Sequence, residues 1–99
     1  ENEGQREQAT PDKLGYMKVF PNPATDELSI VFNLQEAGAV QLMVVSTTGQ
    51  VAYRQAFQAD AGRQESIMDV SQWTPGVYIV QLITDGRTLT QKVVVTGQR

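Results

Sequence analysis

Ninety-nine residues, 40% of them hydrophobic, are enough for one small core and leave no room for a second one. The formal net charge of −3 and the eight scattered Lys and Arg residues argue against a nucleic-acid-binding module, which would normally carry a basic stripe. Because the chain has no cysteine and no histidine, it can form no disulfide, no Cys/His zinc site and no Ser-His-Asp triad.

Residues 1–15 come first, and we predict that they form a flexible linker. Only Ala9 and Leu14 carry apolar side chains here, so ordering the segment would bury too little surface to offset the lost chain entropy. A helix over residues 1–8 would have no apolar face with which to pack. The segment also lacks the apolar stretch of a secretory signal peptide. If the protein is exported, we therefore expect its signal either upstream in a longer precursor or in the domain itself, residues 16–99.

From Tyr16 onward, apolar residues alternate with polar ones, which is typical of β-strands with one buried face. An apolar-rich run over residues 16–20 is followed by runs at 27–32, 39–46, 51–57, 64–70, 77–83 and 88–95. No segment of useful length has helical periodicity. Seven short strands with turn residues between them predict an all-β fold, a small antiparallel β-sandwich.

The alternation also predicts which side chains face the core. The inward positions are Leu28, Ile30, Phe32, Val40, Leu42, Val44, Val51, Tyr53, Phe57, Leu89, Val93 and Val95. Over residues 64–70, Met68 and Val70 alternate with Ile67 and Asp69, and the pattern leaves open which of the two faces is inward. The run at 77–83 is apolar on both faces, which predicts a central strand covered on both sides.

Proline and glycine residues separate the runs. Pro21 and Pro23 end the first strand and hold Asn22 extended between them. The pair Asp85-Gly86 suits a type I′ hairpin, and Pro75-Gly76 suits the centre of a type II turn. Gly49 and Gly62 suit positive-φ positions in slightly longer hairpins.

No group of side chains predicts catalysis or a bound metal or cofactor. Asp26 and Glu27 are adjacent, but neighbouring side chains in a turn point apart, so a solvated turn is the better interpretation than an acid–base pair. Asp60, Asp69 and Asp85 lack the spacing of a calcium loop. Most of the seven aromatic residues fall at inward positions, and Trp73 could cap the open end of the core. This pattern favours a core role over the flat aromatic row of a carbohydrate-binding module.

A series of short stretches, taken in order, resembles a known family. They are Val19-Phe20-Pro21-Asn22-Pro23-Ala24, Leu28-Ser29-Ile30, Val44-Val45-Ser46 leading to Gly49-Gln50-Val51, Met68-Asp69-Val70-Ser71, Pro75-Gly76-Val77-Tyr78 and Lys92-Val93-Val94-Val95. The series resembles the type IX secretion C-terminal sorting domain, the Por secretion tail (type A) of exported Bacteroidetes proteins, over about residues 18–95.

The resemblance implies an Ig-like sandwich of about seven strands that is not an enzyme. Such a domain directs an attached protein from the periplasm through the type IX translocon and across the outer membrane. A sortase-like cysteine protease then removes it, here within residues 1–15, and the cargo is joined to lipopolysaccharide on the cell surface or released. Lipopolysaccharide is thus a partner only of the processed cargo, and nucleic acid is not a partner.

The resemblance also implies where recognition takes place, although packing explains some of the same residues. The positions are Gly49, Gln50, Gly76, Tyr78, Lys92, Val93, Val94 and Val95. Turn geometry accounts equally well for the glycines, core packing for Tyr78, and edge protection for Lys92. Unlike most members of the family, the chain continues past this run with Thr96-Gly97-Gln98-Arg99.

A last strand at a sheet edge could bind without a pocket, because its unpaired backbone groups could accept a partner strand or a second copy. Two other functions stay open from the sequence. One is an Ig-like interaction or spacer module of a secreted protein. The other is an anchoring domain retained by a component of the secretion machinery.

Overall fold

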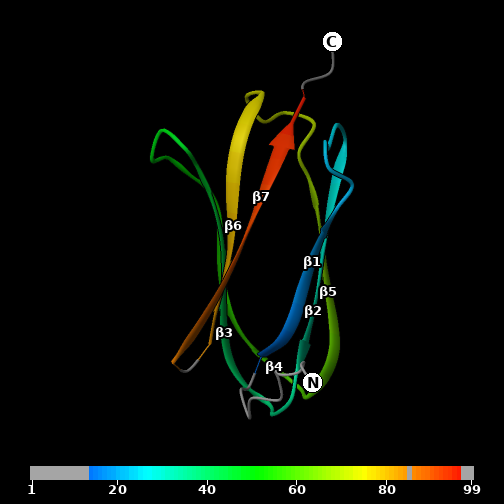
Figure 1. Cartoon of the computed structure of the whole chain (residues 1–99), viewed down its shortest axis with the longest axis vertical. Coiled ribbons are helices and arrows are strands. Elements are labelled where there is room, and N and C mark those ends of the chain that lie inside the picture. The colour runs from blue at the N-terminus through cyan, green and yellow to red at the C-terminus, as the bar shows by residue number, and fades with distance from the viewer. Residues whose placement is uncertain (1–13, 85, 97–99) are drawn as a thin grey trace, which may run out of the picture.

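The computed structural model describes residues 14–84 and 86–96 (Figure 1). Seven strands follow one another in this part of the chain: β1 (Leu14–Phe20), β2 (Glu27–Leu34), β3 (Gly38–Ser46), β4 (Val51–Ala59), β5 (Gly62–Asp69), β6 (Gly76–Thr84) and β7 (Arg87–Val95). The described residues contain no helix, and hence none that could span a membrane. The all-β prediction is confirmed. Leu14 and Gly15, assigned to the linker from the sequence, belong to β1, and residues 1–13 lie outside the described part.

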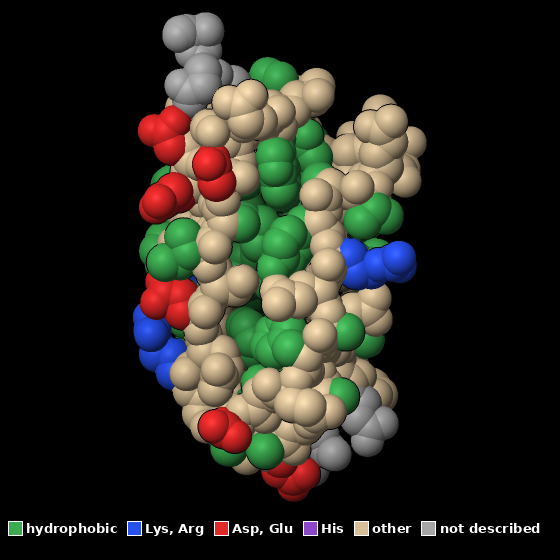
Figure 2. All heavy atoms as spheres, turned by 180° about the vertical axis from the view of Figure 1, so that it is seen from behind, with side chains coloured by type: hydrophobic (Ala, Val, Ile, Leu, Met, Phe, Trp, Pro, Cys, Tyr) green, Lys and Arg blue, Asp and Glu red, His purple; other side chains and the backbone are tan. Residues whose placement is uncertain are grey.

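The strands form two antiparallel sheets that pack face to face (Figure 1). One has three strands in the order β1-β2-β5, and the other has four in the order β4-β3-β6-β7. The edge strands β1 and β7 contact each other across the sandwich. Figure 2 shows the side opposite to the view of Figure 1, where hydrophobic side chains line an open furrow along the molecule. The predicted β-sandwich is confirmed.

The core lies between the sheets, where the alternation of the strands places their apolar side chains. Phe32, Leu28, Ile30, Leu42 and Leu82 are among the largest side chains that are almost completely buried. Fully burying one such side chain stabilises the fold by about 1.5–3 kcal/mol. The predicted inward faces of β2, β3 and β7 are confirmed, and that of β4 is confirmed in part. In β5, whose inward face the sequence left open, Met68 is buried and Ile67 is exposed.

Val51 was predicted to face the core, and this prediction is wrong. Its side chain is 53% exposed. The pairing of β3 with β4 shifts register between Val44 and Val45, so Val44 pairs with Tyr53 whereas Val45 pairs with Val51. The extra residue at this bulge shifts the alternation of inward and outward side chains along β4. Val51 therefore points to the outer face, as Val45 does.

Strand β6 was predicted to be covered on both sides, and this prediction is also wrong. Its inner side chains, including Val80 and Leu82, are fully buried. Val77, Ile79 and Ile83 point to the outer face and are only half-buried. β6 is central within its sheet, but the described residues provide no third layer over it. Its second apolar face is therefore a surface of the molecule.

Two turn predictions need correction, although Gly49 and Gly62 do have positive φ, at 98° and 109°. Gly62 does not close a hairpin, because it lies where the chain passes from one sheet to the other. Gly76 has φ of 157° and already belongs to β6, so it cannot be the third residue of a type II turn, which needs about +80°. The predicted Asp85-Gly86 turn lies partly outside the described residues, since only Gly86 is described; its φ is 79°.

Candidate functional site

The residues predicted for recognition gather at one end of the four-stranded sheet, where the C-terminus leaves the molecule (Figure 1). Gly49 and Gln50 form the turn between β3 and β4. Gly76 begins β6, where it pairs with Val95 of β7. The backbone N–H of Thr47 donates to the carbonyl of Val77 at 3.1 Å and joins the turn to β6. We call this region, residues 20–26, 46–50, 70–76 and 92–96, the C-terminal end of the sandwich.

Several of these residues have structural roles that leave little surface for a partner. Val93 and Val95 are 0% and 1% exposed and lie in the core. The Tyr78 side chain is buried, and its hydroxyl donates to the carbonyl of Thr74 at 2.5 Å. Trp73 packs on the Tyr78 ring, with centroids 5.1 Å apart, and covers the rim of the core as predicted. These residues build the end of the sandwich from within.

The side chains that do reach the surface are few. Gln50 and Lys92 are exposed, and Val94 is half-buried. Gln50 also lines a small cavity of about 250 Å³ beside Trp73 and Tyr78. Of the eight predicted residues, these three present a side chain that a partner could contact.

The segment between β1 and β2 is bound to the end of β7. The side-chain amide of Asn22 accepts a hydrogen bond from the Val94 N–H at 3.0 Å and donates to the Lys92 carbonyl at 3.4 Å. Ala24 continues the contact, since its N–H donates to the Val94 carbonyl and its carbonyl accepts from the Thr96 N–H, both at 2.8 Å. The Phe20–Pro21 and Asn22–Pro23 peptide bonds that flank Asn22 are both cis. Asn22 and Ala24 together act as a short extra strand beside β7.

This contact limits the predicted edge-strand binding. From residue 92 to residue 96, the outer edge of β7 is occupied by residues 22–24 of the same chain. A partner strand could pair only with the earlier part of β7, residues 88–91. Sequence analysis missed the role of Asn22 because its partners lie 70 and 72 residues away. The available signal was the side-chain amide itself, which carries the donor and acceptor of a backbone peptide.

The turn between β5 and β6 also belongs to this end. The Trp73 N–H donates to the Val70 carbonyl at 3.0 Å, so the chain reverses at residues 70–73 rather than at Pro75-Gly76. The Asp69 carboxylate accepts a hydrogen bond from the Ser71 N–H at 2.9 Å. Hydrogen bonds from the side chain and the backbone of Ser71 lower the pKa of Asp69 below its ordinary value of 3.8.

We expect the Asp69 carboxyl to titrate below 3.8 in the folded protein. A lowered pKa means that ionised Asp69 stabilises the fold above pH 3.8, and that this stabilisation is lost as the pH falls through the folded-state pKa. Carboxyl NMR chemical shifts followed from pH 6 to pH 2 would measure it. Ser71→Ala should move the midpoint upward, toward 3.8. A midpoint at or above 3.8 in the unmodified chain would contradict the assignment.

The carboxylates do not form a metal site in the described part of the chain. Asp60 precedes β5 and Asp69 ends it, so they lie at opposite ends of an eight-residue strand. Asp85, the third residue considered for calcium, falls outside the described residues. Within the described ranges, no three aspartate or glutamate side chains are close enough to hold a metal ion. Asp26 and Glu27 are both exposed.

The aromatic residues do not form a flat surface row. Tyr16 and Phe20, on β1, are 43% and 44% exposed and do not face the core as predicted for most aromatic residues. Phe32 is buried, and Tyr53, Phe57 and Trp73 are partly buried against the core. This distribution favours a packing role over carbohydrate binding.

Comparison with known proteins identifies the family of the chain. A family model described as "Secretion system C-terminal sorting domain" matches residues 18–96. The matched span runs from β1 to the residue after β7 and includes all eight predicted recognition residues and Asn22. No curated protein matches the chain significantly. The match confirms the family resemblance seen in the sequence.

Proposed function

Because this chain belongs to the secretion system C-terminal sorting domain family of the type IX pathway, we propose that it directs an attached protein through the type IX translocon. The family match over residues 18–96 is the observation that carries this proposal. The domain is not itself catalytic; it is the address that the export machinery reads. The attached protein passes from the periplasm across the outer membrane to the cell surface or the medium.

Processing completes the proposed pathway. A sortase-like cysteine protease cleaves within residues 1–15, and the cargo is joined to lipopolysaccharide or released. The position of β1 supports this order, because a cut before Leu14 leaves all seven strands in one piece. The segment is polar, with Glu, Gln, Lys and Arg over much of its length.

Within the domain, we assign contact with the export machinery to Gln50, Lys92 and Val94. Their side chains reach the surface, whereas Tyr78, Val93 and Val95 shape the end of the sandwich from the core. Gly49 and Gly76 supply the backbone conformations on which this shape depends. The predicted recognition residues thus fall into two groups. One group contacts the export machinery, and the other maintains the shape of the end of the sandwich.

Fusing residues 1–99 behind a secreted reporter enzyme tests the function. In a type IX-competent bacterium the reporter should reach the cell surface or the medium, and in a strain lacking the translocon it should stay in the periplasm. Protease accessibility of the reporter on intact cells measures the difference. Equal periplasmic retention in both strains would favour a spacer module. Surface delivery with an uncleaved domain would favour a retained anchor.

A further inference from the structure

The outer face of the four-stranded sheet carries an apolar surface that no described residue covers. We define the outer strip as Met43, Val45, Val77, Ile79, Ile83 and Val94, all half-buried. Strand register joins most of the strip, because Val45 pairs with Ile79 and Val77 pairs with Val94, while Gln81, which pairs with Met43, lies between Ile79 and Ile83. Cross-strand pairs share one face of a sheet, so these side chains lie side by side on β3, β6 and β7.

The two sheets differ in charge. Strands β3, β4, β6 and β7 contain Arg54, Arg87 and Lys92 but no aspartate or glutamate, whereas β1, β2 and β5 contain Glu27, Glu65 and Asp69 together with Lys18 and Arg63. Figure 2 shows this difference from behind: acidic side chains lie along one sheet, together with Lys or Arg, and at the ends, whereas the other sheet displays Lys or Arg alone.

Two of these cations flank the outer strip. Arg54 pairs with Met43, and Lys92 pairs with Ile79, so both cations lie on the face of the strip. A chain that is acidic overall therefore has one apolar face with a cationic border.

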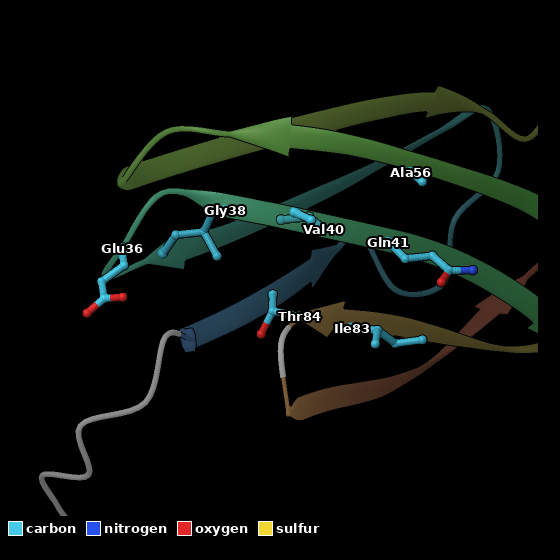
Figure 3. A pocket seen from close by; sticks show the side chains of 9 residues that line it. Glu36, Gly38, Val40, Gln41, Ala56, Ile83 and Thr84 are labelled. Atoms are coloured by element: carbon cyan, nitrogen blue, oxygen red, sulfur yellow. The ribbon is translucent and has the colours of Figure 1, made fainter.

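A cavity adjoins one end of the strip. The pairing of β3 with β6 stops at Gln41 and Ile83, although β3 begins at Gly38 and β6 continues to Thr84. The two strand ends diverge here and leave a cavity of about 550 Å³ (Figure 3). Thr84 and the acidic Glu36 both line it; Thr84 is only 8% exposed, and its hydroxyl oxygen is buried without a hydrogen-bond partner among the described residues. Most of the other lining residues, including Leu34, Val40 and Ile83, are apolar, so the cavity suits an apolar side chain.

We propose that the outer strip docks onto a protein surface of the export machinery that is apolar and bordered by carboxylates. An aromatic side chain of that partner enters the cavity, and the partner's carboxylates face Arg54 and Lys92. This inference rests on the proposed function and adds to it the surface and the chemistry of the partner. Buried aromatic anchors with a polar rim are the common arrangement of protein interfaces.

Charge and geometry favour this partner over two others. Two cations are too few for electrostatic recognition of a membrane, which typically uses about 4–8 basic residues. A second copy meeting the strip face to face would bring Arg54 and Lys92 against the same cations of its partner, and like charges at a contact oppose association. A carboxylate-bordered protein surface has neither disadvantage.

Export of the reporter fusion tests the proposal. Val45→Thr/Ile79→Thr keeps β-branched side chains in the strands but makes the centre of the strip polar, and Lys92→Glu reverses the charge at its border. The threonine variant should lower the surface-exposed fraction of the reporter at least about tenfold, because central interface residues carry most of the binding energy. Lys92→Glu should also lower it, because the new carboxylate would face the carboxylates of the partner. Lys92→Arg keeps the charge and should therefore lower export less than Lys92→Glu.

The other sheet provides matched controls. Ile67, on β5, is 57% exposed, and Lys18, on β1, is also exposed. Ile67→Thr and Lys18→Glu make the same chemical changes away from the strip and should leave export at the level of the unmodified fusion. Circular dichroism of each purified chain reports whether it is folded. Should the double threonine variant unfold, Lys92→Glu, at an exposed side chain, decides the test alone.

The outcomes separate the two proposals. No export of the unmodified fusion would overturn the proposed function. Normal export of that fusion together with the folded strip variants would overturn only the docking face.

Sedimentation equilibrium should find the purified chain monomeric; a dimer that dissociates on Ile79→Thr would instead make a second copy the occupant. Vesicles of phosphatidylglycerol and phosphatidylcholine should not bind the chain, and binding that Lys92→Glu abolishes would make lipid the occupant.

Discussion

Val93→Asp should unfold the domain, with a loss of more than about 4 kcal/mol in the free energy of unfolding. Val93 is 0% exposed and pairs with Tyr78 in the core, so the carboxylate would be buried without a partner. Urea denaturation followed by tryptophan fluorescence would measure the effect, since Trp73 packs on Tyr78. A cooperative transition at the wild-type midpoint would contradict the assignment of Val93 to the core.

The neighbouring residue supplies the control for this variant. Val94 belongs to the outer strip, so Val94→Asp places the same carboxylate on the surface. This variant should keep a cooperative transition, and we expect it to lower export while leaving the domain folded. The contrast separates the structural role of the last strand from its role in recognition.

The difference between the buried and the exposed side chains of β7 also matters for a truncated chain. Deleting residues 92–99 from a fusion should leave the cargo in the periplasm. The deletion removes Val93 and Val95 from the core as well as Lys92 from the surface, so it tests folding and recognition together. Single side-chain variants on the two faces of β7 are the more discriminating experiment.

Asn22→Ala should release the end of β7, at a cost of about 1–2 kcal/mol in stability. The substitution removes both side-chain hydrogen bonds, to the Val94 N–H and to the Lys92 carbonyl, and a hydrogen bond contributes about 0.5–1.5 kcal/mol net. Amide hydrogen exchange measures the effect locally. The Val94 amide should exchange faster than in the unmodified chain, whereas amides in the middle of β6 should change only as far as global stability does.

Asn33→Ala is the control for this variant. Asn33 lies on β2, where it pairs with Tyr16 and Arg63 and not with β7. This substitution should leave exchange at Val94 unchanged relative to the amides of β6. Identical Val94 exchange in the Asn22→Ala variant and the unmodified chain would show that Asn22 does not hold the strand.

Sequence reasoning succeeded where the signal is local. The alternation around Leu28, Ile30 and Phe32 predicts strand and buried face together, because successive side chains of a strand point to opposite sides. It failed at Val51, where a bulge changes the face of the sheet to which the side chain points. The bulge depends on pairing with β3 rather than on the residues of β4. It failed at Gly76 because Pro-Gly is a turn signal, while hydrogen bonds at Val70 and Asp69 place the reversal earlier.

The stretch Phe20-Pro21-Asn22-Pro23-Ala24 shows the same division. The sequence alone determined that a strand ends here, since proline lacks the N–H that a strand ladder needs. It also determined the number of strands, most of their buried faces and the family to which the chain belongs. Only the tertiary structure decided that Asn22 binds β7, that the motif residues meet at one end, and that the uncovered face of β6 lies beside Lys92. The physical reason is that strand pairing joins residues far apart in the chain, and a local pattern contains no information about its distant partner.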